Sequence, residues 1–274
     1  MKRVVAIIQA RMGSARLPGK VLSMIGGRPM LWHIVQRVRA VHGVADVVVA
    51  SSDTVPDEPI REFGRRFGVD VFSGSLNDVL DRFYHAARGY QADIVLRVTG
   101  DCPLFDPKIV SQMLQRFLND GTLDHIGVAT GAGVANCSDI GRYPDGLDAE
   151  LTSIGTLEIA WREATQPVDR EHVTPFVWKQ PQRFRVATFY SPVDYSQLRW
   201  TVDNQEDLEV VRAIYAALYK PERHFLMQDV LDFLATHPEV SHWNQQFIGR
   251  EGYQQFWKDR SVPCQQSLNA QHVA

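Results

Sequence analysis

The chain has 274 residues, of which 45% are hydrophobic, 22% charged and 10% aromatic. This composition is typical of globular proteins and excludes the disordered, collagenous and fibrous classes. The formal net charge of −3 gives the chain as a whole no electrostatic attraction to nucleic acid or to an anionic membrane.

The cysteines and the first residues favour a cytoplasmic protein. Cys102, Cys137 and Cys264 are far apart and form no C-x-x-C pair, which argues against a disulfide framework and against a thiolate zinc site. Lys2 and Arg3 precede only five apolar residues, fewer than a secretory signal needs. No stretch reaches the roughly 18 apolar residues of a membrane span. We therefore expect neither a membrane nor a nucleic acid as partner.

Predicted strands and helices alternate through the first half of the chain. Apolar runs predict buried strands over residues 4–8, 46–50, 69–72 and 93–98. Apolar residues at helical spacing predict helices over residues 31–38, 59–67 and 78–88 and through 109–117, and a loop rich in Gly and Pro covers 9–29. This alternation predicts an α/β fold, with a mostly parallel central sheet and helices on both faces. Ligands of such sheets bind where the parallel strands end.

The second half is less regular. Residues 127–142 are rich in Gly, Ala and Ser and predict a loop or flap. Strands are predicted over 147–151, 183–190 and 198–203, the second with an antiparallel alternative, and helices over 205–218 and 227–235. Because no linker divides the chain, we expect one domain over residues 1–260, with a substrate-facing part at about 127–195. Residues 261–274 lack an apolar face and predict a disordered tail.

The loop after the first strand carries the most informative pattern. It places three cations, Arg11, Arg16 and Lys20, around glycines at 13 and 19. Glycine lets backbone N–H groups approach an anion closely, and arginine adds forked donors suited to phosphate oxygens. A triphosphate is the natural ligand, although the loop matches neither the Walker A pattern nor G-x-G-x-x-G. A solvated surface loop is the alternative.

Two aspartates, Asp101 and Asp203, each follow a predicted buried strand. Carboxylates at the active edge of a sheet can hold Mg²⁺ together with substrate phosphates. The alternatives are structural: Asp101 in a turn or as the cap of the helix near Pro107, and Asp203 in a capping box with Glu206. Two carboxylates that converge on one metal beside a cationic glycine loop indicate nucleotidyl transfer.

Four motifs make the chain resemble a known superfamily: I-I-Q-A-R-M-G-S-A-R-L-P-G-K-V-L, T-G-D-C-P-L, P-D-G-L-D and W-T-V-D-N-Q-E-D-L. Over about residues 3–220 it resembles the sugar cytidylyltransferases, and most closely the spore-coat polysaccharide cytidylyltransferase-like branch. The relatives are CMP-3-deoxy-manno-octulosonate synthetase and acylneuraminate cytidylyltransferase. The resemblance implies a nucleotide-diphospho-sugar transferase fold, CTP as donor, Mg²⁺ as cofactor, release of pyrophosphate and, by analogy, a homodimer.

The resemblance also assigns residues to roles. Arg11, Arg16 and Lys20 would bind the CTP phosphates, Asp101 and Asp203 would bind the metal, and Arg11, Lys20, Asp101 and Asp203 would form the catalytic set. The full nucleotide-binding set is Gln9, Ala10, Arg11, Gly13, Arg16, Lys20, Ser51, Ser73, Asp78 and Arg82. A capped surface helix is the alternative for residues 73–82.

Two polar clusters in the less regular half of the chain are the candidates for binding the acceptor. The acceptor-binding set is Asp145 and Asp148, toward hydroxyls or an amine, and Arg170 and His172, toward a carboxylate or phosphate. His172 is also a candidate general base, and a solvated ion pair of Arg170 with Glu171 is the alternative. The 3-deoxy-manno-octulosonate synthetases carry D-E-P where this chain has D-C-P at residues 101–103, so their acceptor is not carried over.

The function expected from these patterns is transfer of CMP from CTP to a sugar, a sugar acid or a related acidic acceptor, with phosphoryl and phosphonate compounds included. One alternative is a glycosyltransferase of the same broad fold, although D-x-D is not present at residues 101–103. The other is a non-catalytic nucleotide-binding protein, although this chain keeps the cations and both aspartates.

Overall fold

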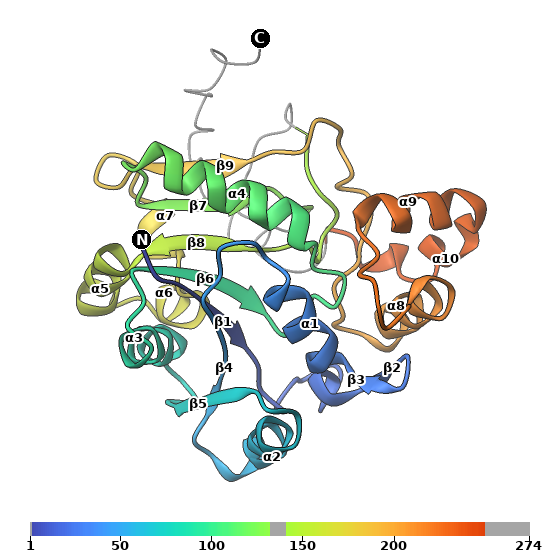
Figure 1. Ribbon diagram of the computed structural model, residues 1–274, viewed down its shortest axis with the longest axis horizontal. Helices are drawn as coiled ribbons and strands as arrows, with labels where there is room; N and C mark the ends of the chain where they lie inside the picture. The colour runs from blue at the N-terminus through green and yellow to red at the C-terminus, as the bar shows by residue number, and fades with distance from the viewer. Residues whose placement is uncertain (1, 132–140, 250–274) are drawn as a thin grey trace.

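A seven-stranded sheet forms the centre of the molecule (Figure 1). The computed structural model describes residues 2–131 and 141–249. The strand order is β5-β4-β1-β6-β8-β7-β9. The strands are β1 (Val4–Gln9), β4 (Asp46–Ser52), β5 (Asp70–Gly74), β6 (Ile94–Thr99), β7 (His125–Val128), β8 (Glu150–Ser153) and β9 (Val186–Phe189). A separate hairpin pairs β2 (Met24–Ile25) with β3 (Arg28–Pro29).

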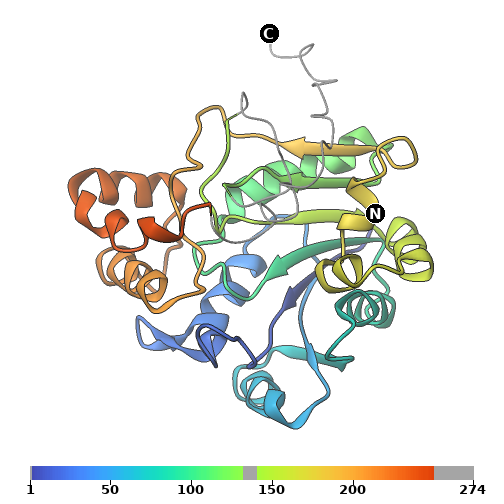
Figure 2. The ribbon, with the colours of Figure 1, turned by 180° about the vertical axis from the view of Figure 1, so that it is seen from behind.

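Helices cover both faces of the sheet (Figures 1 and 2). They are α1 (Met30–Arg39), α2 (Glu58–Phe67), α3 (Val79–Gly89), α4 (Pro107–Asp120), α5 (Ile154–Glu163), α6 (Pro167–His172), α7 (Pro175–Trp178), α8 (Gln205–Leu218), α9 (Met227–Thr236) and α10 (Pro238–His242). Three single 3-10 turns lie at η1 (Lys20–Leu22), η2 (Val55–Asp57) and η3 (Gln245–Phe247). Among the described residues, no helix is long and apolar enough to span a membrane.

The alternation of side chains along β1 divides the core in two. Val4, Ala6 and Ile8 pack in one cluster with buried residues of α1, α2, α4 and α8. Val5 and Ile7 face the other side, toward buried residues of α3, α5 and α7. Strands that are apolar on both faces are typical of α/β sheets, because helices cover each face. The predicted mostly parallel sheet with helices on both faces is confirmed.

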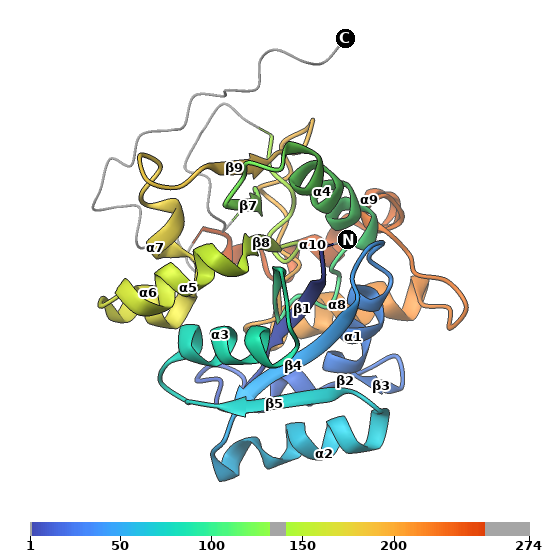
Figure 3. The same cartoon turned by 60° about the vertical axis from the view of Figure 1, so that its left-hand side comes forward.

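Strand β8 runs against its neighbours. β5, β4, β1 and β6 are mutually parallel, whereas β8 is antiparallel to both β6 and β7. The antiparallel alternative for residues 183–190 is wrong, because β9 pairs in parallel with β7. Since β8 is reversed, its beginning lies at the edge where β1 and β6 end (Figure 1). Figure 3 shows the other end of β8, where α5 follows it. The residues that precede β8 therefore reach the edge at which ligands are expected.

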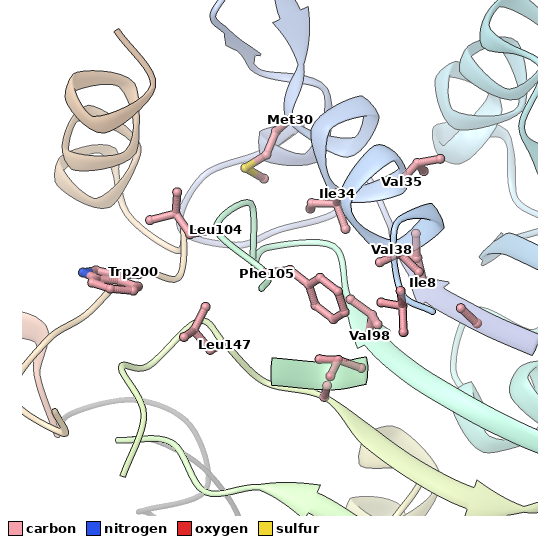
Figure 4. Close-up of a cluster of buried hydrophobic side chains, with 14 of the residues drawn as sticks. Ile8, Met30, Ile34, Val35, Val38, Val98, Leu104, Phe105, Leu147 and Trp200 are labelled. Carbon is pink, nitrogen blue, oxygen red and sulfur yellow. The ribbon is translucent and has the colours of Figure 1, made fainter. Parts of the chain in front are cut away.

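The predicted strand over residues 198–203 is wrong. This segment forms only an isolated bridge between Arg199 and Asp145. Its side chains nevertheless alternate: Trp200 and Val202 are buried in the core, and Arg199, Thr201 and Asp203 line a polar cavity. A strand-like pattern thus arises in an irregular segment that lies between the core and a cavity. Figure 4 shows Trp200 in the core cluster with Leu104, Phe105 and Leu147.

The strand predicted over residues 147–151 begins later, at Glu150. Gly146 has φ +103, and a Cβ there would lie 2.4 Å from the backbone N of Thr201. Only glycine allows this close approach without strain. The turn at Gly146 therefore brings residues 145–148 against the segment 199–201 before the strand begins.

The predicted elements of residues 4–99 lie within two residues of their predicted bounds, whereas α4 extends three residues past Phe117; β2, β3, η1 and η2 were not predicted, and α8 and α9 are also confirmed. The short elements β7, α5, α6, α7 and α10 were not predicted. Within the predicted loop 127–142, residues 127 and 128 belong to β7, and 132–140 lie outside the described residues. The predicted tail over 261–274 lies outside them too, and the division into one domain and a tail stays a prediction.

Candidate active site

A cavity of about 540 Å³ opens where β1 and β6 end. Five segments line it: the loop after β1, the end of β6 with the loop that follows, the residues before β8, the end of α6, and the segment 199–203. The lining residues are Gln9, Ala10, Arg11, Ser14, Ala15, Arg16, Lys20, Val21, Arg97, Thr99, Gly100, Asp101, Cys102, Asp145, Asp148, Glu171, His172, Arg199, Thr201 and Asp203. Most of the predicted site residues are thus brought together.

Gly100 lets the loops after β1 and β6 meet. Its N–H donates to the carbonyl of Gln9 over 2.8 Å, and a Cβ on it would lie 2.7 Å from that same oxygen. A real Cβ does not come so near to a backbone oxygen, so a side chain here would push the two loops apart. Glycine at this position places Asp101 directly beside the cationic loop.

Lys20 connects the cationic loop with both predicted metal-binding aspartates. Its Nζ lies 3.1 Å from Asp101 Oδ2 and 2.7 Å from Asp203 Oδ1, and it donates to the carbonyl of Val202 over 2.8 Å. Burial of Lys20 lowers its pKa, but the carboxylates of Asp101 and Asp203 outweigh this and raise the pKa above its ordinary value. The ammonium is therefore charged and lies between two carboxylates.

Asp203 is surrounded by cations. Arg16 Nη2 lies 3.0 Å from its Oδ1, which Lys20 also contacts, and Arg199 Nη2 lies 3.1 Å from its Oδ2. Burial raises the pKa of Asp203, but Lys20 and Arg16 overcome this and hold the pKa well below its ordinary value. This carboxylate is ionised throughout the neutral range.

The alternative of Asp203 as a helix cap is wrong. Helix α8 begins at Gln205, after the N-cap residue Asn204, and Asp207 is the carboxylate that accepts from the backbone. Asp207 Oδ2 accepts the N–H groups of Asp203 and Asn204 over 3.0 and 2.9 Å. The carboxylate of Asp203 is thus held by side-chain cations, and its charge faces the cavity.

Asp101 is not a helix cap either. Asp106 caps α4, since its Oδ1 accepts the N–H groups of Lys108 and Ile109 over 2.8 and 3.2 Å. Asp101 instead shares Lys20 with Asp203, so both carboxylates reach one common point. Two carboxylates plus substrate phosphates form the usual protein site for Mg²⁺. Among the described residues no group of three His, Cys, Asp or Glu could hold a metal ion. The two carboxylates that share Lys20 match the part of such a site that the protein itself supplies.

Asp57 holds the cationic loop and was missed by the sequence analysis. This carboxylate is 2% exposed and accepts the N–H of Met12 over 2.7 Å. It also accepts from the hydroxyls of Ser51 and Ser52 and from the N–H of Ser52. Burial raises the pKa of Asp57, but the hydrogen bonds from Met12 and Ser52 outweigh it and lower the pKa. Asp57 therefore fixes the loop to the end of β4.

Some predicted nucleotide-binding residues do not line the cavity: Gly13, Ser51, Ser73, Asp78 and Arg82. The strand register places Ser51 beside Ser73. Arg82 is 1% exposed, donates to the carbonyl of Ser75 over 2.6 Å, and has no hydrogen-bond partner for its Nε among the described residues. Burial lowers the pKa of Arg82 to about 10. Their predicted roles stay predictions.

Asp145 and Asp148 line the cavity from the segment that precedes β8. Asp148 accepts from the Thr130 hydroxyl over 2.6 Å and from the Gly146 N–H over 3.0 Å. Asp145 Oδ2 lies 2.9 Å from Arg199 Nη1. Burial, and then the carboxylate of Asp148, raise the pKa of Asp145 well above its ordinary value, and burial also raises the pKa of Asp148.

Arg170 does not line the cavity. Its guanidinium pairs with Asp78 at 3.0 Å from Nε and 2.5 Å from Nη2, and so joins α6 to the start of α3. The ion pair with Glu171 that was the alternative is wrong, because Arg170 pairs with Asp78 and Glu171 lines the cavity. His172 does line it. Burial, and then Arg97, lower the pKa of His172, which is therefore neutral at pH 7.

Two arginines in the cavity wall, Arg97 and Arg199, were also missed. Arg97 Nη1 lies 2.5 Å from Glu150 Oε2, on the neighbouring strand. A signal for both existed, because the pattern R-x-T-x-D occurs at residues 97–101 and again at 199–203. Each copy ends in one of the two aspartates that share Lys20.

Comparison with known proteins gives a consistent result. A family model described as cytidylyltransferase matches residues 5–225. The spore coat polysaccharide biosynthesis protein SpsF of Bacillus subtilis is 32% identical over 222 residues, which cover 78% of this chain and 87% of SpsF. The structure of a cytidylyltransferase from Leptospira borgpetersenii has a TM-score of 0.79 at 31% identity and covers 88% of this chain and 97% of that one. The structure of CMP:2-keto-3-deoxy-manno-octonic acid synthetase with CTP has a TM-score of 0.60 at 24% identity, covering 78% and 98%.

Proposed function

Because the chain belongs to the cytidylyltransferase family, we propose that this enzyme transfers CMP from CTP to a sugar, a sugar acid or a related acidic acceptor and releases pyrophosphate. The proposal includes Mg²⁺ as the cofactor. The observation that carries it is the convergence of Asp101 and Asp203 on the ammonium of Lys20, beside a cationic loop at the carboxyl ends of β1 and β6. A triphosphate with its cation fits this combination of charges.

The cationic loop binds and orients the triphosphate. Arg11, Arg16 and Lys20 line the cavity and supply charged donors, which are the strong hydrogen-bond partners of phosphate oxygens. Mg²⁺, held by Asp101 and Asp203, would neutralise charge on the phosphates when bound. Positioning and charge neutralisation supply most of the catalysis that such a transfer requires.

In this proposal the acceptor binds where Asp145, Asp148 and His172 line the cavity. Asp145 and Asp148 accept hydrogen bonds from its hydroxyl groups. The cation beside His172 is Arg97, which lines the cavity, and not Arg170 as the sequence predicted. His172 is neutral at pH 7, so it can accept a proton from the attacking hydroxyl. CTP as the donor is supported by the family, and by the similar structure of CMP:2-keto-3-deoxy-manno-octonic acid synthetase, which is a complex with CTP.

The nucleotide is tested by pyrophosphate release from each of the four nucleoside triphosphates with Mg²⁺. The acceptors form a panel of neutral sugars, sugar acids, sugar phosphates and phosphonates. We expect release with CTP and an acidic acceptor. Release with another nucleotide at an equal or higher rate would contradict the choice of CTP, and no release with any acceptor of the panel would contradict the proposed transfer.

The metal carboxylates are tested by Asp101→Asn and Asp203→Asn. Each change removes a negative charge that attracts the cation and keeps the shape of the side chain. We expect turnover to fall by orders of magnitude in both variants. A variant with normal turnover would remove that carboxylate from the proposed metal site.

A further inference from the structure

Arg199 lies at the centre of a group of three carboxylates. Its Nε and Nη2 contact Asp207 Oδ1 and Oδ2 at 2.9 and 3.1 Å. Its Nη2 also contacts Asp203 Oδ2 at 3.1 Å, and its Nη1 contacts Asp145 Oδ2 at 2.9 Å. The side chain is only 2% exposed. One guanidinium therefore contacts both Asp203, which is predicted to bind the metal, and Asp145, which is predicted to bind the acceptor.

The contact with Asp207 fixes the plane of the guanidinium. Two parallel N–H···O bonds between arginine and a carboxylate determine the orientation as well as the distance. Asp207 is fully buried and is itself held by the N–H groups of residues 203 and 204 and by Asn244, whose Nδ2 lies 2.9 Å from its Oδ1. The start of α8 thus determines where Nη1 and Nη2 of Arg199 point.

This arrangement assigns each oxygen of Asp203 a different neighbour. Arg199 takes Oδ2, which leaves Oδ1 directed to Lys20, the point that Asp101 also reaches. A carboxylate free to rotate would present either oxygen, or both, to a cation. Partners behind a metal ligand commonly set its orientation in this way.

We propose that Arg199 is a positioning residue for the transfer reaction: it orients Asp203 toward the bound cation and holds Asp145 at a fixed place relative to it. This inference rests on the proposed function, because it assumes that Asp203 binds the cation of a metal–CTP complex. Lysine cannot replace arginine here, since an ammonium is a point charge that cannot make the paired contact with Asp207.

The test is the affinity for CTP with Mg²⁺ and with EDTA, measured by calorimetry on wild type and on Arg199→Lys. In EDTA we expect both proteins to bind CTP equally, because the cationic loop is unchanged. We expect the gain in affinity that Mg²⁺ gives wild type to fall roughly tenfold or more in Arg199→Lys. With an acceptor present, kcat should fall by a comparable factor while KM for CTP with the metal rises.

Arg37→Lys is the matched control. Arg37 is 3% exposed and bonds only to the Phe105 and Phe225 carbonyls and the Tyr215 hydroxyl in the described part of the chain, and it does not line the cavity. The Arg37→Lys substitution should lower the melting temperature, but Mg²⁺ should increase the affinity for CTP as much as it does in wild type. If Arg199→Lys is unfolded, Asp207→Asn breaks the same paired contact from its other side and should show the same loss.

The outcomes separate the two proposals. If Mg²⁺ increases the affinity for CTP equally in wild type and in Arg199→Lys, Arg199 does not position Asp203, and the proposed function stands. An equal loss in Arg37→Lys would also overturn the inference, because the effect would then follow from any buried arginine. If wild type itself gains nothing from Mg²⁺, both the proposed metal site and the role of Arg199 are wrong.

Discussion

Replacing Lys20 with methionine should change the binding of cations and of nucleotide in opposite directions. In the structure the ammonium of Lys20 occupies the point shared by Asp101 and Asp203. A divalent cation that binds these two carboxylates must displace it. Methionine has a similar length and no charge, so in Lys20→Met no ammonium lies between the two carboxylates, although Arg16 still contacts Asp203.

The size of the effect follows from the two ion pairs. A hydrogen bond to a charged group contributes on the order of 1.5–3 kcal/mol when buried, but Asp101 is 28% exposed and solvent weakens its pair with Lys20. We take about 2 kcal/mol for the cost of moving the ammonium away. Since about 1.4 kcal/mol corresponds to a factor of ten, Lys20→Met should bind a divalent cation about 30-fold more tightly in the absence of nucleotide.

The assay is binding of Mn²⁺ as a spin probe, by electron paramagnetic resonance, without nucleotide. Arg16→Met is the control, because Arg16 contacts the same oxygen of Asp203 and is 48% exposed. Arg16→Met removes the same charge but leaves Lys20 between the two carboxylates, so its affinity for Mn²⁺ should rise less than about threefold. CTP binding should weaken in both variants. A Lys20→Met protein that binds Mn²⁺ no more tightly than wild type, or an equal gain in Arg16→Met, would refute the reasoning.

Three further predictions concern the surroundings of the site. Gly100→Ala should lower the free energy of unfolding by about 1–3 kcal/mol, because its Cβ would meet a backbone oxygen; Gly89→Ala, with open space around its Cβ, should not lower it in the same urea titration. Asp57→Ala should weaken CTP binding in calorimetry by releasing the loop at Met12, and Asp57→Asn should weaken it less; equal affinity in all three proteins would contradict this. Burial lowers the pKa of His33 from 6.5 to about 4, so the folded state binds fewer protons than the unfolded state in this range. Stability should therefore fall as the pH drops from 6.5 to 4, and urea titrations of His33→Gln should show a smaller fall.

The nucleotide side of the fold could be predicted from the sequence because local patterns determine it. Residues 4–8 and 46–50 are apolar runs in strands covered on both faces, and the helix over 31–38 has apolar residues at helical spacing. The segment 198–203 shows the limit of such reasoning. Its side chains alternate between core and cavity as in a strand, but no neighbouring strand forms a ladder with it. Periodicity reports burial, and pairing depends on the rest of the fold.

The site could be predicted where a motif places its residues on one edge, and not where packing decides the direction of a side chain. Asp101, Asp203 and Lys20 come together as predicted from the ends of separate segments. Arg170 was predicted to meet the acceptor beside His172, but it turns to Asp78 at the start of α3. Neighbours in the sequence at the end of a short helix point in different directions, and only the packing of α6 on α3 settles which one reaches the cavity.

The reversed direction of β8 separates the residues predicted to bind the acceptor from those predicted to bind the nucleotide in the connectivity of the chain. The cationic loop, Gly100 and Asp101 follow β1 and β6, so a change in their length would disturb strands that lie at the middle of the sheet. Asp145 and Asp148 instead lie between β7 and β8. These two strands pair with each other, and both follow β6 in the strand order, outside β5, β4, β1 and β6. A substitution at Asp145 or Asp148 therefore changes no residue of the ladders that join β5, β4, β1 and β6. Under the proposed function, the choice of acceptor can therefore change at the residues before β8 while the strands that carry the cationic loop stay as they are.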